Sequence, residues 1–268
     1  MLMMTLRPLN KIFSHRDDLI AHVRSISPTA GEGGASAMIG QQSALQDGLD
    51  ALDPAAYGKT RNFLNGKVTR LSPYIRHGMV SLNHVRNLAL ARVTRKSDAE
   101  KLIQELGWRE FYRMVQLHHP SRIWTDVEPY KTGFSPSDYA DELPEDIAEG
   151  ATGVQAIDDI IAILKLDGYL HNHLRMYLAS YVVHWRQVKW QAGARFMLSH
   201  LIDADHASNN LSWQWIASTY SSKPYIFNLE NMQKYCGQQI NTSADANAPL
   251  HDSYDELSAR LFPQMESF

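Results

Sequence analysis

The chain has 268 residues and a formal net charge of −3, with 44% hydrophobic and 21% charged residues. This composition is typical of a globular protein with one large domain or two small ones. Its single cysteine, Cys236, excludes a disulfide framework and any zinc or iron–sulfur site with four cysteine ligands. No stretch approaches 18 uncharged apolar residues, and the N-terminus becomes charged too early for a signal peptide. We therefore expect a cytoplasmic protein without a metal.

The charge is distributed unevenly along the chain. Residues 126–149 contain eight Asp or Glu and one Lys, a net charge of −7, so the rest of the chain carries +4 against the total of −3. A basic face can therefore form elsewhere, and the net charge does not exclude a nucleic-acid partner.

The first third of the chain begins with an extension over residues 1–27. The next segment, "SPTAGEGGAS" (27–36), is expected to be a loop, and its glycines do not form the GxGxxG pattern of a phosphate-binding loop. Ala99, Leu102, Ile103 and Leu106 then recur at helical spacing, which predicts an amphipathic helix.

The rest of the chain continues the helical pattern. The acidic segment 126–153 contains Pro and Gly and is expected to be a surface connection. Isoleucines and leucine at 157, 160, 161 and 164 predict a second helix, and "LRMYLASYVVHW" (174–185) is apolar enough to be a buried one. Residues 236–268 are expected to form a C-terminal tail. We find no alternating strands, so the prediction is all-α, with one helical domain over residues 1–268.

Five segments combine acids, amides, arginines and tryptophans in an unusual way. They are "YGKTRN" (57–62), "TRLSPYIRHG" (69–78), "ELGWREFYR" (105–113), "GYLHNHLRM" (168–176) and "DADHASNNLSWQW" (203–215). In the same order and at similar spacing, they resemble the FAD-binding catalytic domain of DNA photolyases and cryptochromes, over about residues 28–235. That family usually carries an N-terminal antenna domain, whereas only some fifty residues precede Tyr57. The chain thus resembles a short photolyase-like protein, and no antenna chromophore is expected.

The resemblance implies a set of residues that bind FAD. The hydroxyls of Thr69 and Ser72, with nearby backbone amides, suit a pyrophosphate at a helix start, although by themselves they fit an ordinary helix cap equally well. Asn209 faces flavin N5, where an amide can both donate and accept; an isolated Asn-Asn would otherwise indicate a turn or cap. The full set of expected FAD ligands is Tyr57, Thr69, Arg70, Leu71, Ser72, Arg175, Asp203, Asp205 and Asn209.

The resemblance also implies an electron-transfer chain and a buried ion pair. Asp203 and Arg175 form the pair beside the flavin ring, where it would orient the flavin and balance its anionic reduced form. Trp213 and Trp190 match two links that pass electrons to photoexcited FAD, although both would also serve as core residues. The third link does not align, and the candidates Tyr139, Trp124 and Trp185 remain open.

Further residues match the pocket that holds a flipped-out pyrimidine dimer. Trp108 and Trp215 would stack on the two bases, and Glu105 and Asn172 would read their polar edges. Asn172 and Met176 indicate a cyclobutane-dimer pocket, because photolyases of (6-4) photoproducts tend to place histidines there. The expected DNA-binding set is Arg61, Glu105, Trp108, Asn172, His173, Met176 and Trp215.

The affinity for DNA is expected to be low. His173 stands where many photolyases have a phosphate-binding arginine, and the loop "IASTYSSKPYIFN" is short and lacks an arginine before "IFN". Fewer phosphate contacts weaken duplex binding most, because the dimer must there be pulled from the stack. We therefore expect a preference for single-stranded DNA.

The resemblance thus implies a carbon–carbon lyase that splits cyclobutane pyrimidine dimers under blue light. We expect it to be a monomer. Reduced FAD would pass an electron to the dimer and regain it. Glu105 would stabilise the dimer anion, Asn209 would tune N5, and Trp213 with Trp190 would recharge the flavin. Two alternatives are a cryptochrome-like photosensor, which does not need the dimer pocket, and an inactive flavin-binding remnant.

Overall fold

The computed structural model describes residues 10–27 and 36–265, and in these ranges it contains helices and no strand. The α-helices are α1 (Arg16–Ile26), α2 (Gln42–Asp50), α3 (Pro54–Thr60), α4 (Ser72–Arg76), α5 (Leu82–Ala91), α6 (Ser97–His118), α7 (Glu145–Glu149), α8 (Gln155–Asp167), α9 (Asn172–Ser180), α10 (Trp190–His200), α11 (His206–Ala217), α12 (Leu229–Cys236) and α13 (Tyr254–Leu261). Short 3₁₀ turns lie at Pro120–Ile123, Pro136–Asp138 and Ala248–Leu250. The predicted all-α class is confirmed.

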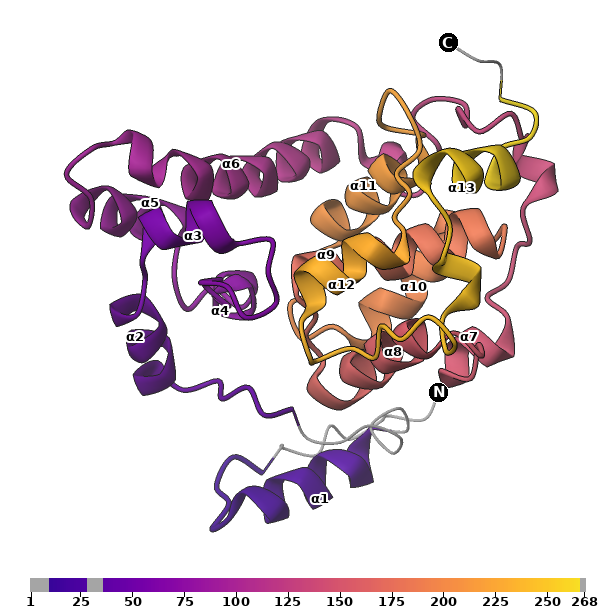
Figure 1. The fold of residues 1–268 in the computed structure, drawn as a ribbon. Helices are drawn as coiled ribbons and strands as arrows, with labels where there is room; N and C mark the ends of the chain where they lie inside the picture. Colours follow the sequence, from indigo (N-terminus) through magenta and orange to yellow (C-terminus); the bar gives the residue numbers. More distant parts are fainter. Residues whose placement is uncertain (1–9, 28–35, 266–268) are drawn as a thin grey trace.

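The longest helix, α6, crosses the top of the molecule in Figure 1 and packs against α3, α5 and α11. Ala99 and Leu102 are buried, as their spacing predicted. Acidic residues Asp98 and Glu100 lie in its first turn, where the helix dipole favours negative charge. The helix ends at His118, two residues before Pro120, which has no N–H to continue it.

The main core is built around α8. Its predicted apolar face is confirmed, since Ile157, Ile160, Ile161 and Leu164 are fully buried. Gly168 ends the helix with a φ of 62°, a left-handed conformation that glycine adopts without strain. The chain then turns directly into the "LHNHLRM" segment at the start of α9.

The predicted helix over 174–185 is divided in the structure. After α9 the backbone widens into a π-helical turn at Tyr181–Trp185. The residues around the junction remain buried, and His184 Nε2 lies 2.9 Å from the carbonyl oxygen of Ile216 at the end of α11. The apolar composition correctly predicted burial, but it carried no signal for the change of helical pitch.

The acidic segment 126–153 links α6 to α8 and also contributes to the core. Tyr130, Tyr139 and Ile147 are buried in the main cluster, and Ala140 forms an isolated bridge with Val188. The segment therefore does more than connect two helices along the surface.

The two ends of the described chain differ in how far their residues are buried. In the C-terminal tail, Leu250 and Leu257 are fully buried, so residues 236–265 pack onto the body through α13. Helix α1, at the bottom of Figure 1, has no buried residue within its described span. The expected loop at 27–36 lies almost entirely outside the described residues.

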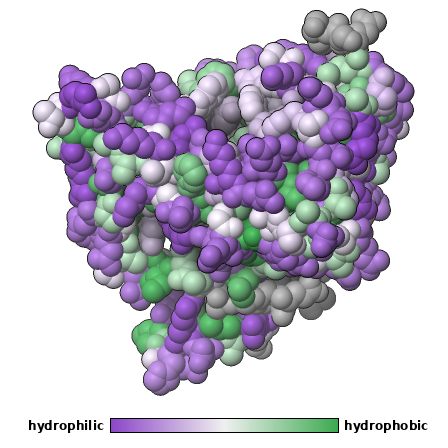
Figure 2. All heavy atoms as spheres, viewed as in Figure 1, coloured by the Kyte–Doolittle hydropathy of each residue, from purple (hydrophilic) through white to green (hydrophobic). Residues whose placement is uncertain are grey.

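The helices fall into two groups that meet along α6 and α11. Helices α2 to α6 lie on the left of Figure 1 and α7 to α13 on the right, while α11 packs against α6, α9 and α10. Figure 2 shows that hydrophilic residues cover most of this face. In the described ranges, no helix is both long and apolar enough to cross a bilayer.

Gly193 allows α10 and α11 to approach closely. A Cβ at this position would lie 2.3 Å from Cη2 of Trp213, so we expect Gly193→Ala to lower the free energy of unfolding by about 1–3 kcal/mol through overpacking. The control is Gly107→Ala on α6, where no described atom lies within 4 Å of the added Cβ and a helical alanine should be neutral or stabilising. Urea unfolding measures both, and an unaltered Gly193→Ala midpoint would contradict this packing.

Candidate functional site

The site is organised by the start of α11. Asp205 is the N-cap residue, and its carboxylate accepts a hydrogen bond of 2.9 Å from the backbone N–H of Ser208. The "DADHASNNLSWQW" segment contacts three of the other four predicted segments. The contacts are made by Ser72 on α4, Arg109 on α6 and Arg175 on α9.

The buried carboxylate of Asp203 joins three parts of the chain. Arg175 Nη2 on α9 lies 2.8 Å from Asp203 Oδ2, and the Ser72 hydroxyl on α4 donates to the same oxygen at 2.5 Å. Burial by itself would raise the pKa of Asp203, but the charge and hydrogen bond of Arg175, with the Ser72 bond, outweigh it and lower the pKa. The Asp203–Arg175 pair therefore forms as the resemblance implied.

A second ion pair involves an arginine that the sequence analysis did not single out. Arg109 Nη2 on α6 lies 3.4 Å from Asp205 Oδ2, and both side chains are largely buried. Burial lowers the pKa of Arg109, while Asp205 and Asp203 oppose that shift. Arg109 lies inside the quoted "GWREF" sequence, so its place in a matched motif was the available signal.

Tyr169 is another residue that sequence reasoning missed. Its ring lies between two guanidinium groups, with Arg70 at 5.7 Å and Arg175 at 5.5 Å from its centroid. Arg70 has a φ of 51°, an uncommon left-handed conformation for a residue with a side chain. Tyr169 thus links the "TRLS" turn to the buried ion pair.

The "TRLS" turn borders a cavity of about 390 Å³. Thr69, Arg70 and Leu71 line it, with Tyr169 and Met38 among the other lining residues. The N-cap of α4, Leu71, has no side-chain cap. Thr69 Oγ1 instead accepts a 3.3 Å hydrogen bond from the Leu71 backbone N–H, and Ser72 donates to Asp203. Neither hydroxyl therefore serves as the ordinary helix cap considered above.

The predicted dimer-binding residues are partly open to solvent. Trp108 on α6 is 52% exposed and Trp215 on α11 is 42% exposed, which is high for tryptophan. Glu105 is held between Arg61 at 3.2 Å and Lys101 at 3.3 Å.

On α9, the exposed Asn172 donates through Nδ2 to Met176 Sδ at 3.3 Å. Tyr57 is half-buried, and burial raises its pKa to about 12, with a further upward contribution from Glu105. Tyr57 therefore stays protonated at neutral pH and can act as a hydrogen-bond donor.

The two histidines beside Asn172 are uncharged at neutral pH. Burial lowers the pKa values of His171 and His173 to about 4. His171 is the N-cap of α9, and its Nδ1 accepts the backbone N–H of His173 at 3.1 Å, while the His173 ring stacks on Tyr235. His173 can become a phosphate-binding cation only well below physiological pH.

Asn209 lies in the first turns of α11. Its Nδ2 donates to the carbonyl oxygen of Ala194 at 3.2 Å and to Oδ1 of Asn210 at 3.0 Å. The Nδ2 of Asn210 is in turn fixed by the Ile123 carbonyl at 2.8 Å. This chain of amides fixes the orientation of Asn209 and leaves its side-chain oxygen outside both bonds.

The tryptophans expected to carry electrons lie on or beside the adjacent helices α10 and α11. Trp213 and Trp190 are buried on the adjacent helices α11 and α10, and the Trp190 indole N–H donates to Asp126 at 2.7 Å. Trp124 stacks on Trp190 with 6.4 Å between centroids and 13° between ring planes. Of the other two candidates, Tyr139 stacks on Tyr130 and Trp185 on Tyr181.

Several buried polar atoms at the site have no hydrogen-bond partner among the described residues. They are Asp203 Oδ1, Arg109 Nε, Ser208 Oγ and Trp213 Nε1. Unsatisfied buried groups are costly, so this cluster fits a polar ligand such as FAD, which carries both donors and acceptors. In the same ranges, no group of three or more His, Cys, Asp or Glu side chains is arranged to hold a metal.

The Asp203–Arg175 pair gives a pH-dependent stability. Because the folded pKa of Asp203 lies below the ordinary 3.8, the pair stabilises the fold above that pH, and its contribution is lost as the pH falls through the folded value. We expect Asp203→Asn to lower the unfolding free energy by about 3 kcal/mol at pH 7. This difference from wild type should shrink below about pH 4. Urea unfolding across pH measures it; a constant difference, or the same loss in the exposed control Asp47→Asn, would contradict the pair.

Comparison with known proteins agrees with this geometry. The model of the family described as "FAD binding domain of DNA photolyase" matches residues 102–244. The deoxyribodipyrimidine photo-lyase of Streptomyces griseus is 32% identical over 205 residues, covering 74% of this chain and 42% of that protein. That of Escherichia coli K12 is 36% identical over 136 residues, covering 48% and 27%. The chain thus spans less than half of the curated relatives that it matches here.

Solved structures have the same fold. A class III photolyase from Agrobacterium tumefaciens matches with a TM-score of 0.60 and 24% identity over 82% of this chain and 44% of that one. A cryptochrome from Synechocystis matches with a TM-score of 0.64 and 24% identity over 75% and 44%. The family match extends over more than half of the 268 residues. The chain therefore belongs to the family defined by the FAD-binding domain of DNA photolyases.

Proposed function

We propose that this chain is a light-dependent flavoprotein that splits cyclobutane pyrimidine dimers in DNA. The main support is that exposed tryptophans and buried, unpartnered polar atoms occur on neighbouring helices. Trp108 and Trp215 are exposed on α6 and α11, and buried polar atoms without partners lie on the same two helices and at Asp203, which pairs with Arg175 of α9.

The cofactor side follows from the residues that fit FAD. Arg175 and Asp203 would hold the polar edge of the ring system, together with Asp205 and Asn209. Tyr57, Thr69, Arg70, Leu71 and Ser72 would hold the phosphate side. When bound, reduced FAD would supply the photoexcited electron that opens the dimer. The chain's own part is to orient the cofactor and to exclude water from it.

The substrate side is the group of Glu105, Trp108, Asn172, Met176 and Trp215. The two exposed indoles would stack on the flipped bases, a contact of about 1–3 kcal/mol for each base. Glu105 between two cations is an acceptor suited to a pyrimidine N–H, and the adjacent Arg61 would supply positive charge where the dimer becomes anionic on accepting the electron. Asn172 would bind the base edge beside Met176.

We further propose a preference for single-stranded DNA. His173, which would face a phosphate, is uncharged at neutral pH because burial lowers its pKa to about 4. A pocket without that cation holds the strand more weakly, and the loss is greatest where the dimer must be extracted from a duplex.

Trp213, Trp190 and Trp124 are proposed as the series that recharges the flavin. Trp124 is favoured as the third member because its ring stacks on Trp190 and is half-buried, so it reaches solvent. A photosensor without repair activity would use the same series. The exposed pair Trp108 and Trp215 supports repair, since a sensor has no use for two stacking walls.

The repair proposal predicts a separation of two activities. We expect Glu105→Ala to slow repair by about 100-fold, while FAD content and photoreduction stay at the wild-type level. The assay is dimer repair under blue light with reductant, on the same dimer in a single strand and in a duplex.

Glu110→Ala is the matched control, because Glu110 is exposed on the same helix. Undiminished repair by Glu105→Ala would overturn the substrate pocket. Equal rates on both DNA forms at physiological salt would overturn the strand preference.

The electron-transfer proposal predicts that Trp124→Phe lowers the rate of FAD photoreduction by at least about tenfold. Repair by chemically reduced protein should not change, because the series is needed only for recharging. Trp185→Phe is the control, since that ring stacks on Tyr181 instead. Photoreduction lost in Trp185→Phe and retained in Trp124→Phe would show that electrons reach the flavin by another path.

A further inference from the structure

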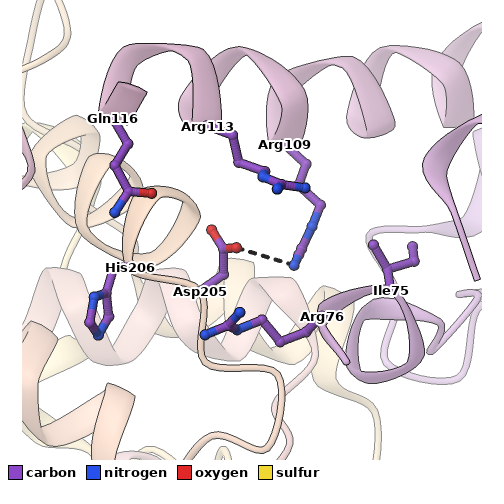
Figure 3. Close-up of a pocket in the computed structure, with 7 residues that line it drawn as sticks. All are labelled: Ile75, Arg76, Arg109, Arg113, Gln116, Asp205 and His206. Carbon is purple, nitrogen blue, oxygen red and sulfur yellow. Dashed lines mark hydrogen bonds and ion pairs between the residues drawn. The ribbon is translucent and has the colours of Figure 1, made fainter. Parts of the chain in front are cut away.

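A second polar cavity lies beside the start of α11, with a volume of about 260 Å³. Figure 3 shows arginines from α6 and α4 pointing toward Asp205 at the α11 N-terminus. Its polar lining consists of Arg76, Arg109, Arg113, Gln116, Asp205 and His206. Of these, only Asp205 belongs to the set expected to bind the flavin or the dimer.

The charges in the cavity are not balanced. Three guanidinium groups face one carboxylate, and that carboxylate already pairs with Arg109 and caps α11. Arg76 is oriented by a hydrogen bond from its Nε to the carbonyl oxygen of Ala204, which does not neutralise it. The Arg113 side chain makes no hydrogen bond or ion pair within the part of the chain that the structure describes. The cavity therefore carries two positive charges in excess.

The cavity lies between exposed cations and the largely buried side chain of Arg109. The Arg109 side chain is only 15% exposed, and its buried Nε has no partner among the described residues. Arg76, Arg113 and His206 are exposed. An anion can thus enter between exposed cations and meet the largely buried Arg109 side chain, which lines the cavity. The N-terminus of the twelve-residue α11 adds its positive dipole.

We propose that this cavity binds a phosphate group. Guanidinium groups match the oxygens of phosphate in bidentate geometry, and three of them from two helices can face different oxygens of one tetrahedral anion. The volume is several times the roughly 30 Å³ that a water molecule occupies in the liquid, so an esterified phosphate also fits. The phosphate can come from free inorganic phosphate or from the backbone of a DNA strand.

The test is a titration of the FAD-loaded protein with inorganic phosphate in the dark, by calorimetry. We expect one site per chain, and about tenfold weaker binding in Arg113→Gln and in Arg76→Gln, the effect of one charge-assisted contact. Arg86→Gln is the control, because Arg86 is exposed on α5 and bonds only to the side chain of its neighbour Asn87. Flavin absorbance verifies that each variant is folded and loaded.

A second arm repeats the titration with an undamaged single-stranded oligonucleotide present. Competition with phosphate assigns the site to the DNA backbone, and its absence assigns it to free phosphate. Phosphate binding only to the FAD-free protein would overturn the proposal, because the cavity would then belong to the cofactor's own phosphates. Unchanged affinity in both arginine variants would overturn it as well. Since no light or dimer is used, this outcome is independent of the repair proposal.

Discussion

The buried contact among Ser72, Arg175 and Asp203 holds the two groups of helices together. It joins α4 from one group of helices to α9 and to the segment before α11 in the other. A buried carboxylate is tolerated only with such partners, since an unpaired charge there would cost several kcal/mol. The contact therefore holds the two helical groups together, and it leaves Asp203 Oδ1 buried without a hydrogen-bond partner among the described residues.

Close packing on the opposite side of α11 completes the arrangement. Gly193 allows the ring of Trp213 to lie against α10, where Trp190 is also buried. The N-cap of α11, Asp205, lines the 260 Å³ cavity, while the helix itself places Trp213 in the core and Trp215 at the surface. Because successive residues of a helix point in different directions, one twelve-residue element can contribute to the three roles proposed above, in the cofactor site, the electron path and the substrate pocket.

Much of this organisation could be predicted from the sequence. The periodic apolar residues of α6 and α8 specified helices and a buried face, and the pairing of Asp203 with Arg175 followed from the family resemblance. Contacts between segments far apart in the chain carried no such signal. Trp124 could not be chosen over Tyr139 and Trp185 until its stacking on Trp190 was visible, and the roles of Arg109 and Tyr169 depend on tertiary contacts. The π-helical turn and the packed C-terminal segment depend likewise on tertiary burial.

We propose that the chain holds FAD beside a pocket for a pyrimidine dimer, and that light drives electron transfer from the reduced FAD to the dimer. The most direct measurement is recovery of intact strand from a thymine dimer in a short single-stranded oligonucleotide, under blue light and reductant, with a dark control. We expect light-dependent recovery of the intact strand by protein that carries one FAD per chain. No recovery from fully loaded, photoreducible protein would contradict it and would favour a photosensor.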